Sequence, residues 1–391
     1  MKMNYQIRVQ SLTELQQPLG MPNDLYQRYQ ESMRNFIVSI SVPSEELGAN
    51  LVEAMNQIGG IAYSPSLAGR KTIILAGYLQ QFQALSEYLS SYSSVYQELA
   101  LTIMNRIKNR IQYPEEIELG GHRFTWGQRT YIMGIINITP DSFSGDGLAN
   151  SSDIDDRIRF SINQAQNFRE AGADILDIGG ESTRPGGEPV EAEEEMQRVV
   201  PVIRALAQNS ALPISVDTQK AKVAEEAMKA GASIINDIWG LQGDPDMAKV
   251  AADYGAVVVV MHNKNTTDYH DLIAETLSFL ETSIERALHF GIPRNHIWID
   301  PGIGFGKTKE QNLEILKRLD EFRVLGQALL LGTSRKSVIG LTLNLPVEER
   351  LEGTAATVAL GVAKNADIMR VHDVRAMSRT ARMADAIIRR A

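Results

Sequence analysis

The chain has 391 residues and a formal net charge of −9 at pH 7. Because 43% of the residues are hydrophobic and 22% are charged, the composition is typical of a globular protein that buries a large core. The negative charge, without long basic runs, argues against nucleic acid or an anionic membrane as the main partner. The chain has no cysteine, which excludes disulfides, thiolate metal sites and cysteine nucleophiles.

A cytoplasmic location is expected. No apolar run reaches the roughly 18 residues of a membrane span. The N-terminal residues are too polar for a signal peptide, and the lack of cysteine fits a reducing compartment.

Residues 1–112 are predicted to form a small α+β domain, since the length is too great for one typical domain. Runs rich in β-branched residues at 35–42 and 71–79 are typical of strands, and a helix is expected to begin after Ser44. An amphipathic stretch at 81–110 predicts a further helix that docks on another surface. A packing or assembly role is therefore favoured over a catalytic one.

Residues 113–129 are interpreted as a linker, because they combine a proline, a glycine pair and several polar side chains. From 130 to 391 the sequence repeats a β-branched run, a polar turn and an amphipathic helical stretch. Eight strands are expected, at residues 131–137, 175–179, 213–217, 233–238, 256–261, 296–300, 328–334 and 367–372. Because strands that are apolar on both faces belong in parallel sheets, this pattern predicts a (β/α)8 TIM barrel.

Polar side chains lie at the end of each predicted strand, although the strand bodies are apolar. Asn137, Asp217 and Asp300 each end a strand, and Asn236 lies near the end of another. In a TIM barrel the active site lies at the C-terminal ends of the strands. One such residue is more often a helix cap or turn former than a catalytic group. Polar residues at all eight ends are hard to assign to capping alone.

The polar residues divide into two chemical classes. The carboxylates and amide of Asp217, Asn236 and Asp300 suit a flat heterocycle that carries N–H donors. The cations are Arg184, Lys336, Arg370 and His372. A cationic pair on the last strand suits a phosphate, so the sequence predicts a ligand with a heterocyclic part and an anionic part.

A magnesium ligand is expected at Asn137. Mg2+ that is held mainly by a diphosphate and by water needs only one or two protein oxygens, and an amide oxygen can supply one. The alternative is structural, because Asn137 also begins an Asn-x-Thr-Pro turn that would by itself explain an asparagine there.

Two long motifs and five short ones lie at these strand ends. The long motifs are MGIINITPDSFS at 133–144 and DIGGESTRPG at 177–186. The short motifs are ISVDT at 214–218, IND at 235–237, DPGIGFGK at 300–307, GTSRKS at 332–337 and RVHD at 370–373. In this order they resemble the signatures of the dihydropteroate synthase family, over residues 131–391 but not over 1–112.

The resemblance implies a transferase that joins dihydropterin-CH2-diphosphate to p-aminobenzoate, with Mg2+ as cofactor. The pterin ligands that it implies are Asp217, Asn236, Met261, Asp300, Phe305 and Lys336. The implied ligands of the diphosphate and its metal are Asn137, Arg370 and His372. The implied p-aminobenzoate site consists of Thr183, Arg184, Pro185, Lys336 and Ser337. Asn137, Lys336, Arg370 and His372 are expected to be catalytic, and the barrel is expected to form a homodimer through its later helices.

Two other functions remain as alternatives. A pterin-dependent methyltransferase shares the barrel and the pterin-holding carboxylates but binds no diphosphate, so Arg370, His372 and Lys336 argue against it. A non-catalytic pterin-binding barrel would be favoured by the loss of Arg370 or Asn137, and both are present. The chain departs from the family pattern at Gly145-Asp146 and in the loop after His262.

Overall fold

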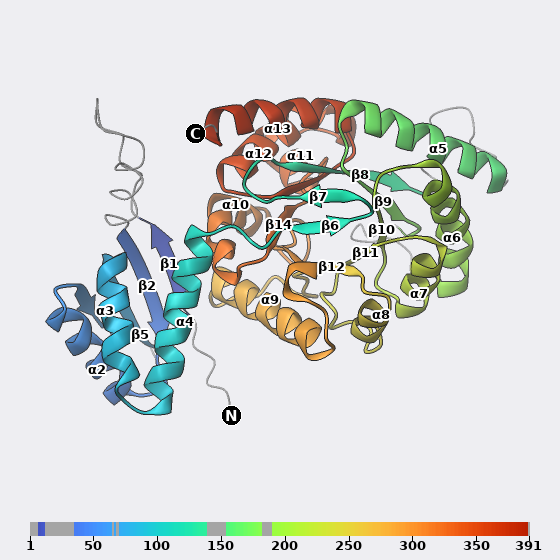
Figure 1. The fold of residues 1–391 in the computed structure, drawn as a ribbon. Coiled ribbons are helices and arrows are strands. Elements are labelled where there is room, and N and C mark those ends of the chain that lie inside the picture. Colours follow the sequence, from blue (N-terminus) through green and yellow to red (C-terminus); the bar gives the residue numbers. More distant parts are fainter. Residues whose placement is uncertain are drawn as a thin grey trace. The chain divides into compact units, whose positions relative to one another are not determined.

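The computed structural model describes residues 7–11, 35–64, 66–67, 70–138, 154–181 and 190–389 (Figure 1). The chain divides into two compact units, one of Met1–Gln112 with Arg323–Gly326 and the other of Tyr113–Phe322 with Gln327–Ala391. None of the described helices is long and apolar enough to cross a membrane.

The first unit contains an antiparallel sheet with strand order β1-β2-β5-β3, and β4 also pairs with β5. Its elements are β1 Ile7–Ser11, β2 Asn35–Ser41, α2 Glu45–Gln57, β3 Ile61–Tyr63, β4 Ser66–Leu67, β5 Arg70–Tyr78, α3 Leu79–Ser90 and α4 Ser94–Ile111. Strand β5 lies between β2 and β3, which is the split βαβ arrangement of ferredoxin-like sheets. The predicted α+β unit is confirmed.

The long helix expected at 81–110 is instead two helices, α3 and α4. They are separated by a serine-rich segment in which the Ser91 hydroxyl donates to the Tyr88 carbonyl at 2.7 Å. Serine side chains compete with the helix for backbone hydrogen bonds, which explains the break. Each helix buries apolar residues, such as Leu85 and Leu89 on α3 and Ile103 on α4.

The second unit is a closed barrel of parallel strands in the order β10-β11-β12-β13-β14-β15-β8-β9. The strands are β8 Tyr131–Asn137, β9 Ile175–Gly179, β10 Ile214–Asp217, β11 Ile234–Asp237, β12 Val257–Met261, β13 Ile297–Asp300, β14 Ala328–Leu331 and β15 Ile368–Val371. The predicted TIM barrel is therefore confirmed, with several strands one to three residues shorter than expected. The strand bodies are almost entirely buried, as parallel strands covered on both faces must be.

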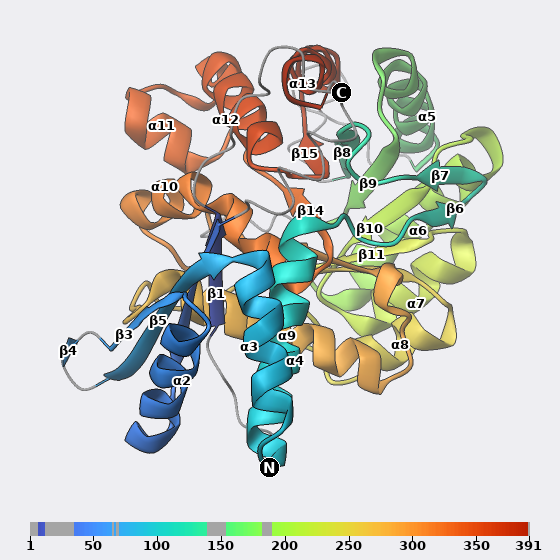
Figure 2. The ribbon, with the colours of Figure 1, turned by 60° about the vertical axis from the view of Figure 1, so that its left-hand side comes forward.

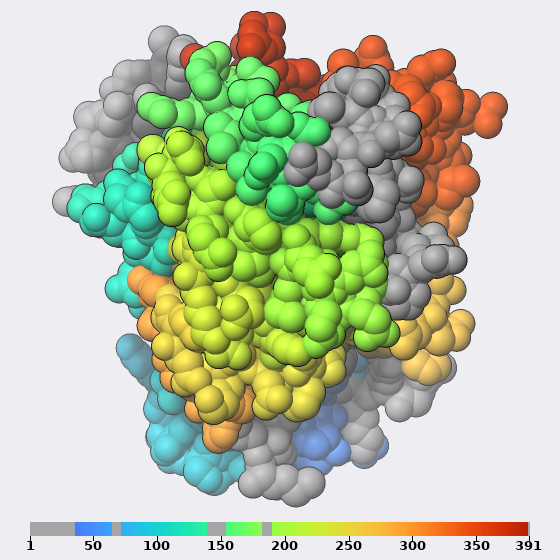
Figure 3. Space-filling model, turned by 90° about the vertical axis from the view of Figure 1, so that its right-hand side faces the viewer, coloured from blue at the N-terminus to red at the C-terminus, as the bar shows by residue number. Residues whose placement is uncertain are grey.

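Helices surround the barrel, as Figures 1 and 2 show. They are α5 Ile154–Ala171, α6 Ala192–Asn209, α7 Ala221–Ala230, α8 Met247–Asp253, α9 Leu272–His289, α10 Lys309–Lys317, α11 Ser337–Leu343, α12 Leu351–Ala363 and α13 Val374–Ile388. Side chains of residues coloured green to yellow, from α5 to α8, cover one outer face of the barrel (Figure 3). The apolar stripe of each helix packs inward, which leaves the strand ends as the place for polar groups.

The segment expected as a linker contributes a hairpin to the barrel unit. Strands β6 Ile117–Leu119 and β7 His122–Phe124 are antiparallel and are joined by Gly120 and Gly121, whose φ angles are 56° and 76°. Two glycines with positive φ favour the tight turn that joins such strands. The hairpin and the residues after it belong to a buried cluster that consists of Ile117, Phe124, Trp126, Tyr131, Met133, Ile175, Ile234, Val257, Val259, Trp298, Ala328, Leu330 and Ile368.

This cluster fills the N-terminal end of the barrel, because most of its strand members lie at or near strand starts. The rings of Phe124 and Trp298 are 6.0 Å apart, and those of Trp126 and Trp298 are 5.5 Å apart. Aromatic packing of this kind leaves no room for a ligand at the N-terminal end. The C-terminal end is thus the place for an active site.

Candidate active site

The barrel register aligns the ends of four neighbouring strands, β8 to β11, and three of these ends carry a polar side chain. Asn137 on β8 lies opposite Gly179 on β9, which lies opposite Asp217 on β10, and Asp217 lies opposite Asn236 on β11. A methyl group in place of the Gly179 hydrogen would lie 3.4 Å from the Asn137 Oδ1 atom and 3.7 Å from Asp217 Oδ2. Glycine at 179 therefore leaves space between a candidate metal ligand and a candidate pterin ligand.

Arg370 on β15 reaches two carboxylates inside the barrel. Its Nε atom donates to Asp177 Oδ2 at 2.7 Å, and its Nη2 atom donates to Asp217 Oδ2 at 2.5 Å. Asp177 is fully buried on β9, and Asp217 is only 5% exposed. The other carboxylate oxygens, Oδ1 of Asp177 and of Asp217, have no partner within the described part of the chain. Two buried acceptors thus remain for a ligand that carries N–H groups or for water.

Burial and charge set the protonation of this cluster. Burial raises the pKa of Asp217 to about 7, although the Arg370 guanidinium opposes the rise. Burial by itself lowers the pKa of Arg370, but Asp177 and Asp217 together raise it above the ordinary value, so the guanidinium stays charged. Near neutral pH, the ionisation of Asp217 is therefore sensitive to what binds beside it.

A second group of candidates meets around Gly332, just after β14. A methyl group there would lie 3.8 Å from Asp300 Oδ2, from Lys336 Nζ and from Arg370 Cβ. The Lys336 amine donates to the Ile303 carbonyl and lies 4.7 Å from the centre of the Phe305 ring. A carboxylate oxygen of Asp300 and the amine of Lys336 thus lie close to one place, beside the base of the Arg370 side chain.

The charges in this second group are also perturbed. Burial raises the pKa of Asp300, whose Oδ1 atom accepts the Gly302 N–H at 2.7 Å. Burial lowers the pKa of Lys336 to about 8, although Asp300 opposes this shift. Titratable groups whose pKa values are displaced toward neutrality by burial, despite a neighbouring opposite charge, are typical of an active site.

His372 and Met261 complete the ring of strand ends. The backbone N–H of His372 donates to Ser334 Oγ at 3.1 Å, and its Nδ1 atom lies 3.0 Å from the same oxygen. This contact orients the imidazole at the end of β15, next to β8, which carries Asn137. Met261 ends β12 directly opposite Asp300 on β13.

Residues 133–372 match the family model described as "Pterin binding enzyme". The chain is 52% identical to the dihydropteroate synthase of Clostridium beijerinckii over 275 residues, which are 70% of this chain and 100% of that protein. It is 50% identical to the Bacillus subtilis dihydropteroate synthase over 264 residues, which are 68% of this chain and 90% of that protein. The chain belongs to the dihydropteroate synthase family.

Solved structures of dihydropteroate synthases have the same barrel. That of Clostridium difficile in the presence of pteroic acid has a TM-score of 0.65 at 50% identity and covers 68% of this chain and 100% of its own. That of Yersinia pestis with a sulfonamide drug complex has a TM-score of 0.64 at 39% identity, and it covers 70% of this chain and 99% of its own. That of Xanthomonas albilineans with 4-aminobenzoic acid has a TM-score of 0.65 at 39% identity, and it covers 70% of this chain and 98% of its own. The predicted synthase activity, a transfer of the pterin-methyl group, is confirmed.

The residues that the family resemblance implied for p-aminobenzoate fall partly outside the described part of the chain. Thr183, Arg184 and Pro185 lie outside the described residues, as does the Gly145-Asp146 position. Ser337 is exposed at the start of α11, next to Lys336. It also lines a cavity of about 400 Å³, together with Gly340, Leu341, Asn344, Leu345, Pro346 and Arg350.

The capping alternative holds at one strand end of this synthase. Asp237 ends β11, and its two carboxylate oxygens accept the Trp239 N–H at 2.9 Å and the Leu241 N–H at 2.7 Å. Leu241 has a φ of 63°, so the carboxylate stabilises a turn of unfavourable backbone conformation. Asp237 is thus structural, although it stands beside Asn236 in the same motif.

Sequence reasoning missed two buried groups next to this site, Asp177 and the pair of Lys307 and His262. Asp177 carried a usable signal, because a carboxylate inside an apolar strand requires a partner. The Lys307 Nζ atom lies 2.8 Å from His262 Nδ1, and nothing in the sequence indicates that these two residues meet.

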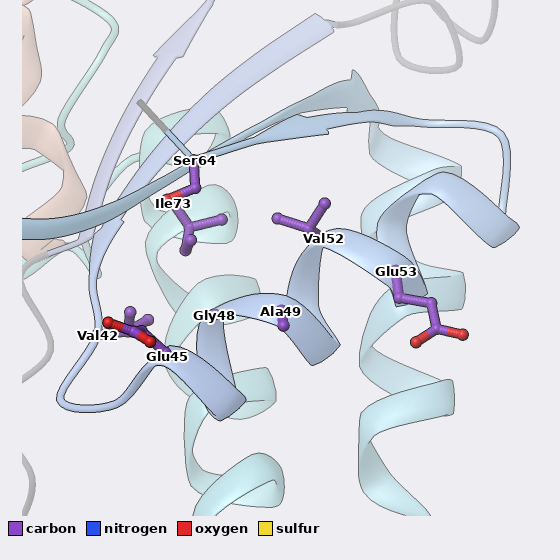
Figure 4. A pocket seen from close by; sticks show the side chains of 8 residues that line it. All are labelled: Val42, Glu45, Gly48, Ala49, Val52, Glu53, Ser64 and Ile73. Atoms are coloured by element: carbon purple, nitrogen blue, oxygen red, sulfur yellow. The ribbon is translucent and has the colours of Figure 1, made fainter. Parts of the chain in front are cut away.

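A separate pocket of about 380 Å³ lies in the first unit, between helix α2 and strand β5 (Figure 4). Its lining is Val42, Glu45, Gly48, Ala49, Val52, Glu53, Ser64 and Ile73. Among the described residues that line it there are two carboxylates and no cation. This chemistry does not suit a diphosphate, so the pocket is not a second site for the synthase substrate.

Proposed function

We propose that the C-terminal end of the barrel carries out the synthase reaction, with the pterin on one side and the diphosphate on the other. The observation that carries this proposal is the meeting of Asp217, Asp300, Lys336 and Arg370 within one ring of strand ends. Carboxylates on one side accept N–H groups of a heterocycle, and cations on the other side attract a polyanion.

The pterin side consists of acceptors on neighbouring strands. Asp217 Oδ1 is buried and has no partner among the described residues, and Asn236 is its neighbour across the β10–β11 pair. Asp300 lies on β13, two strands along the barrel from β11, next to Met261 on β12. A flat ring between these walls can donate N–H hydrogen bonds from its edges to these acceptors and make apolar contacts with its faces. Phe305 and Lys336 are assigned to the pterin slot from the family resemblance, and the Lys336 amine lies 4.7 Å from the centre of the Phe305 ring.

The diphosphate side consists of Arg370, His372 and Asn137, because β15 and β8 are neighbours in the barrel. Arg370 uses Nε and Nη2 for Asp177 and Asp217, which leaves its Nη1 atom for a phosphate oxygen. The His372 imidazole is oriented through Nδ1, and the ring is assigned to a second phosphate oxygen. The assignment of Thr183, Arg184, Pro185, Lys336 and Ser337 to p-aminobenzoate stays a proposal from the family.

The residues present fit a Mg2+ that is bound through its substrate. Within the described part of the chain, no group of three or more acidic or histidine side chains could hold a metal ion. Mg2+ often keeps several waters and binds through substrate phosphates and one or two protein oxygens, and the Asn137 amide oxygen beside Gly179 could supply one. When bound, the ion would neutralise charge on the diphosphate leaving group.

The chemistry requires mainly the stabilisation of a leaving anion. The amine nitrogen of p-aminobenzoate forms a bond to the methylene carbon, the carbon–oxygen bond to diphosphate breaks, and the amine loses one proton to solvent. Arg370 and His372 stabilise the negative charge as it develops. The methylene carbon becomes cationic beside the electron-rich pterin, so we favour a loose displacement that needs no strong general base.

Purified protein, supplied with pterin diphosphate, p-aminobenzoate and Mg2+, is expected to release dihydropteroate and diphosphate in equal amounts. Chelation of Mg2+ should reduce turnover at least about 100-fold, since one electrostatic contact to a transition-state anion contributes a factor of that order. Both products are measured by chromatography, and Mg2+ added back should restore the rate. No dihydropteroate at any enzyme concentration would refute the proposed function, whereas turnover insensitive to chelation would refute only the metal assignment.

A homodimer is proposed through helices α11, α12 and α13, which lie side by side in Figures 1 and 2. These helices carry large apolar side chains in solvent, among them Leu341, Leu343, Leu351, Leu360, Met383, Ile387 and Ile388. Ile387 is 70% exposed and Leu360 is 64% exposed. An apolar surface spread over three adjacent helices is typical of a face that another chain covers.

Replacement of both Leu360 and Ile387 by arginine should therefore convert the dimer to a monomer. Each buried, unpaired charge costs several kcal/mol, so the dissociation constant should rise at least about 100-fold. Molar mass is measured by sedimentation over a range of concentrations. Leu288→Arg on α9, at a residue that is 36% exposed, is the matched control and should remain dimeric. A monomeric wild-type protein at all concentrations would contradict the proposal.

Residues 1–112 are proposed to form an accessory domain of a cytoplasmic enzyme, with the catalytic domain beginning near residue 130. Support comes from the family match, which starts at 133, and from the compactness of the first unit. When product formation is measured, residues 113–391 alone should be active. A folded but inactive fragment would show that the first domain contributes to catalysis.

A further inference from the structure

Lys307 is a buried lysine that the proposed mechanism does not use. It lies near the end of the loop that joins β13 to α10, and it is only 9% exposed. Lysine is rarely buried without a partner, because its charged amine must otherwise give up hydration. A buried lysine next to an active site therefore requires a structural or functional reason.

Three acceptors surround the Lys307 amine. The Nζ atom donates to the Gly302 carbonyl at 3.0 Å and to the Phe305 carbonyl at 3.1 Å, and it lies 2.8 Å from His262 Nδ1. An ammonium group has three N–H bonds, so the protonated amine can satisfy all three acceptors at once.

His262 can accept such a bond because it is neutral. Burial, together with the charges of Lys307 and Lys264, lowers the pKa of His262 to about 2. Burial also lowers the pKa of Lys307 to about 7, and of the charges facing it Asp300 raises this pKa and Lys336 lowers it. The proton of the pair therefore belongs to the lysine, and His262 presents a lone pair at Nδ1.

The loop that Lys307 holds has little freedom of its own. Gly302 and Gly306 have φ angles of 73° and 55°. A methyl group on Gly302 would lie 1.9 Å from the His262 carbonyl oxygen, and one on Gly306 would lie 2.2 Å from the Lys264 carbonyl oxygen. The loop is thus pressed against residues 262–264, and the Lys307 amine ties the two segments together.

The same loop forms one wall of the proposed pterin slot. Its Gly302 N–H donates to Asp300, its Ile303 carbonyl accepts from Lys336, and its Phe305 ring lies against the Lys336 amine. The two carbonyls that Lys307 holds belong to Gly302 and Phe305, on either side of Ile303. A shift of the loop would therefore move the groups that face Asp300 and Lys336.

We propose that Lys307, paired with His262, is a positioning residue for pterin binding: its amine fixes the loop after β13 so that Phe305 and Lys336 face the pterin. The inference rests on the proposed assignment of Asp300, Phe305 and Lys336 to the pterin slot. Lys307 acts through these groups and does not itself touch the substrate.

Lys307→Met keeps the length of the side chain but removes the three polar contacts. We expect a tenfold or larger loss of affinity for a dihydropterin without diphosphate. The hydrogen bonds of the charged amine hold the loop that carries the pterin ligands, and their loss should weaken pterin binding by about that factor or more. The KM for pterin diphosphate should rise more than the KM for p-aminobenzoate because, of the pterin ligands that the loop contacts, only Lys336 is shared with the p-aminobenzoate site. Calorimetry gives the first quantity, steady-state kinetics the others, and thermal unfolding shows whether the variant is folded.

Lys309→Met is the matched control, because Lys309 lies two residues further on, is 38% exposed and pairs only with Glu310 in the described part of the chain. It should bind pterin as the wild-type protein does. A Lys307→Met variant that unfolds at a lower temperature yet binds pterin normally would overturn the proposal, because the lysine would then be structural alone.

A second pair of variants tests the proposal even if Lys307→Met fails to fold. His262→Gln retains an acceptor for the amine and should keep most of the pterin affinity, whereas His262→Leu removes the acceptor and should lose it. Equal pterin affinities in these two variants would overturn the proposal. Turnover by the wild-type protein, measured first, tests the proposed function separately, since it does not depend on Lys307.

Discussion

Replacement of Arg370 by alanine is expected to reduce turnover about 100- to 1000-fold and to destabilise the barrel. The guanidinium pairs with Asp177 and Asp217, and both carboxylates are buried. Leaving buried charges without their partner costs about 3–5 kcal/mol of unfolding free energy, and loss of one contact to the leaving anion slows the reaction about 100- to 1000-fold. Urea denaturation measures the first effect, and product formation at saturating substrates measures the second.

Arg129→Ala is the control for this variant. Arg129 also makes a two-point contact with a carboxylate, that of Asp174 at 2.6 and 3.0 Å, but its side chain is 52% exposed. So exposed an ion pair contributes at most about 1 kcal/mol to the free energy of unfolding. The pair lies at the N-terminal end of the barrel, away from the proposed active site, so activity should be unchanged. If Arg370→Ala were as stable as Arg129→Ala, the buried cluster would not depend on its cation.

The structure also changes which part of the pterin diphosphate substrate the Arg370→Ala variant should affect. From the sequence, Arg370 is expected to act chiefly on the diphosphate and Asp217 on the pterin. Because the two side chains are bonded to each other, Arg370→Ala should weaken the binding of both parts of the substrate. Arg370→Lys keeps the charge but cannot reach two carboxylates with a rigid fork, so it should rescue little activity.

Replacement of Asp217 by asparagine is expected to lower kcat/KM for pterin diphosphate about 10- to 100-fold, because a hydrogen bond to a charged acceptor contributes about 1.5–3 kcal/mol. The side chain keeps its shape, so the fold should survive. The KM for p-aminobenzoate should change little. Asp244→Asn, which alters a carboxylate whose oxygens accept the Ala221 and Asp246 N–H groups, is the control outside the site.

The same variant should change how stability depends on pH. Burial raises the pKa of Asp217 from 3.8 to about 7, so the folded protein holds this proton more tightly than the unfolded chain does. Its contribution to stability is therefore complete below about pH 4 and is lost as the pH rises through about 7. Between pH 5 and 7.5, the wild-type protein should lose stability relative to Asp217→Asn. Parallel pH profiles of unfolding free energy for the two proteins would contradict the assignment.

Much of the fold and of the site could be predicted from the sequence because it follows from local periodicity. Alternating apolar strands and amphipathic helices are sufficient to predict parallel strands, and parallel strands place all their C-terminal residues at one end of the barrel. Asn137, Asp217 and Asp300 could thus be recognised as candidates before any coordinates were known. The division into acceptors and cations followed from side-chain chemistry alone.

The sequence could not show which side chains the polar residues of the site contact in the folded protein. Arg370 and Asp177 are 193 positions apart and Lys307 and His262 are 45 apart, and no local pattern links them. Burial changed their chemistry as well, since the pKa of Asp217 and that of Lys307 both move toward 7 only because the folded barrel removes water.

The sequence by itself thus determined the architecture, the family and the set of polar strand ends, because these depend on residue type and spacing along the chain. The tertiary structure alone decided that Arg370 ties Asp177 to Asp217, that residues 117–124 form a hairpin of the barrel core, and that Lys307 holds the loop after β13. Closure of the barrel brings residues that are distant in sequence within hydrogen-bonding distance in a dry interior, and no local sequence pattern predicts such contacts.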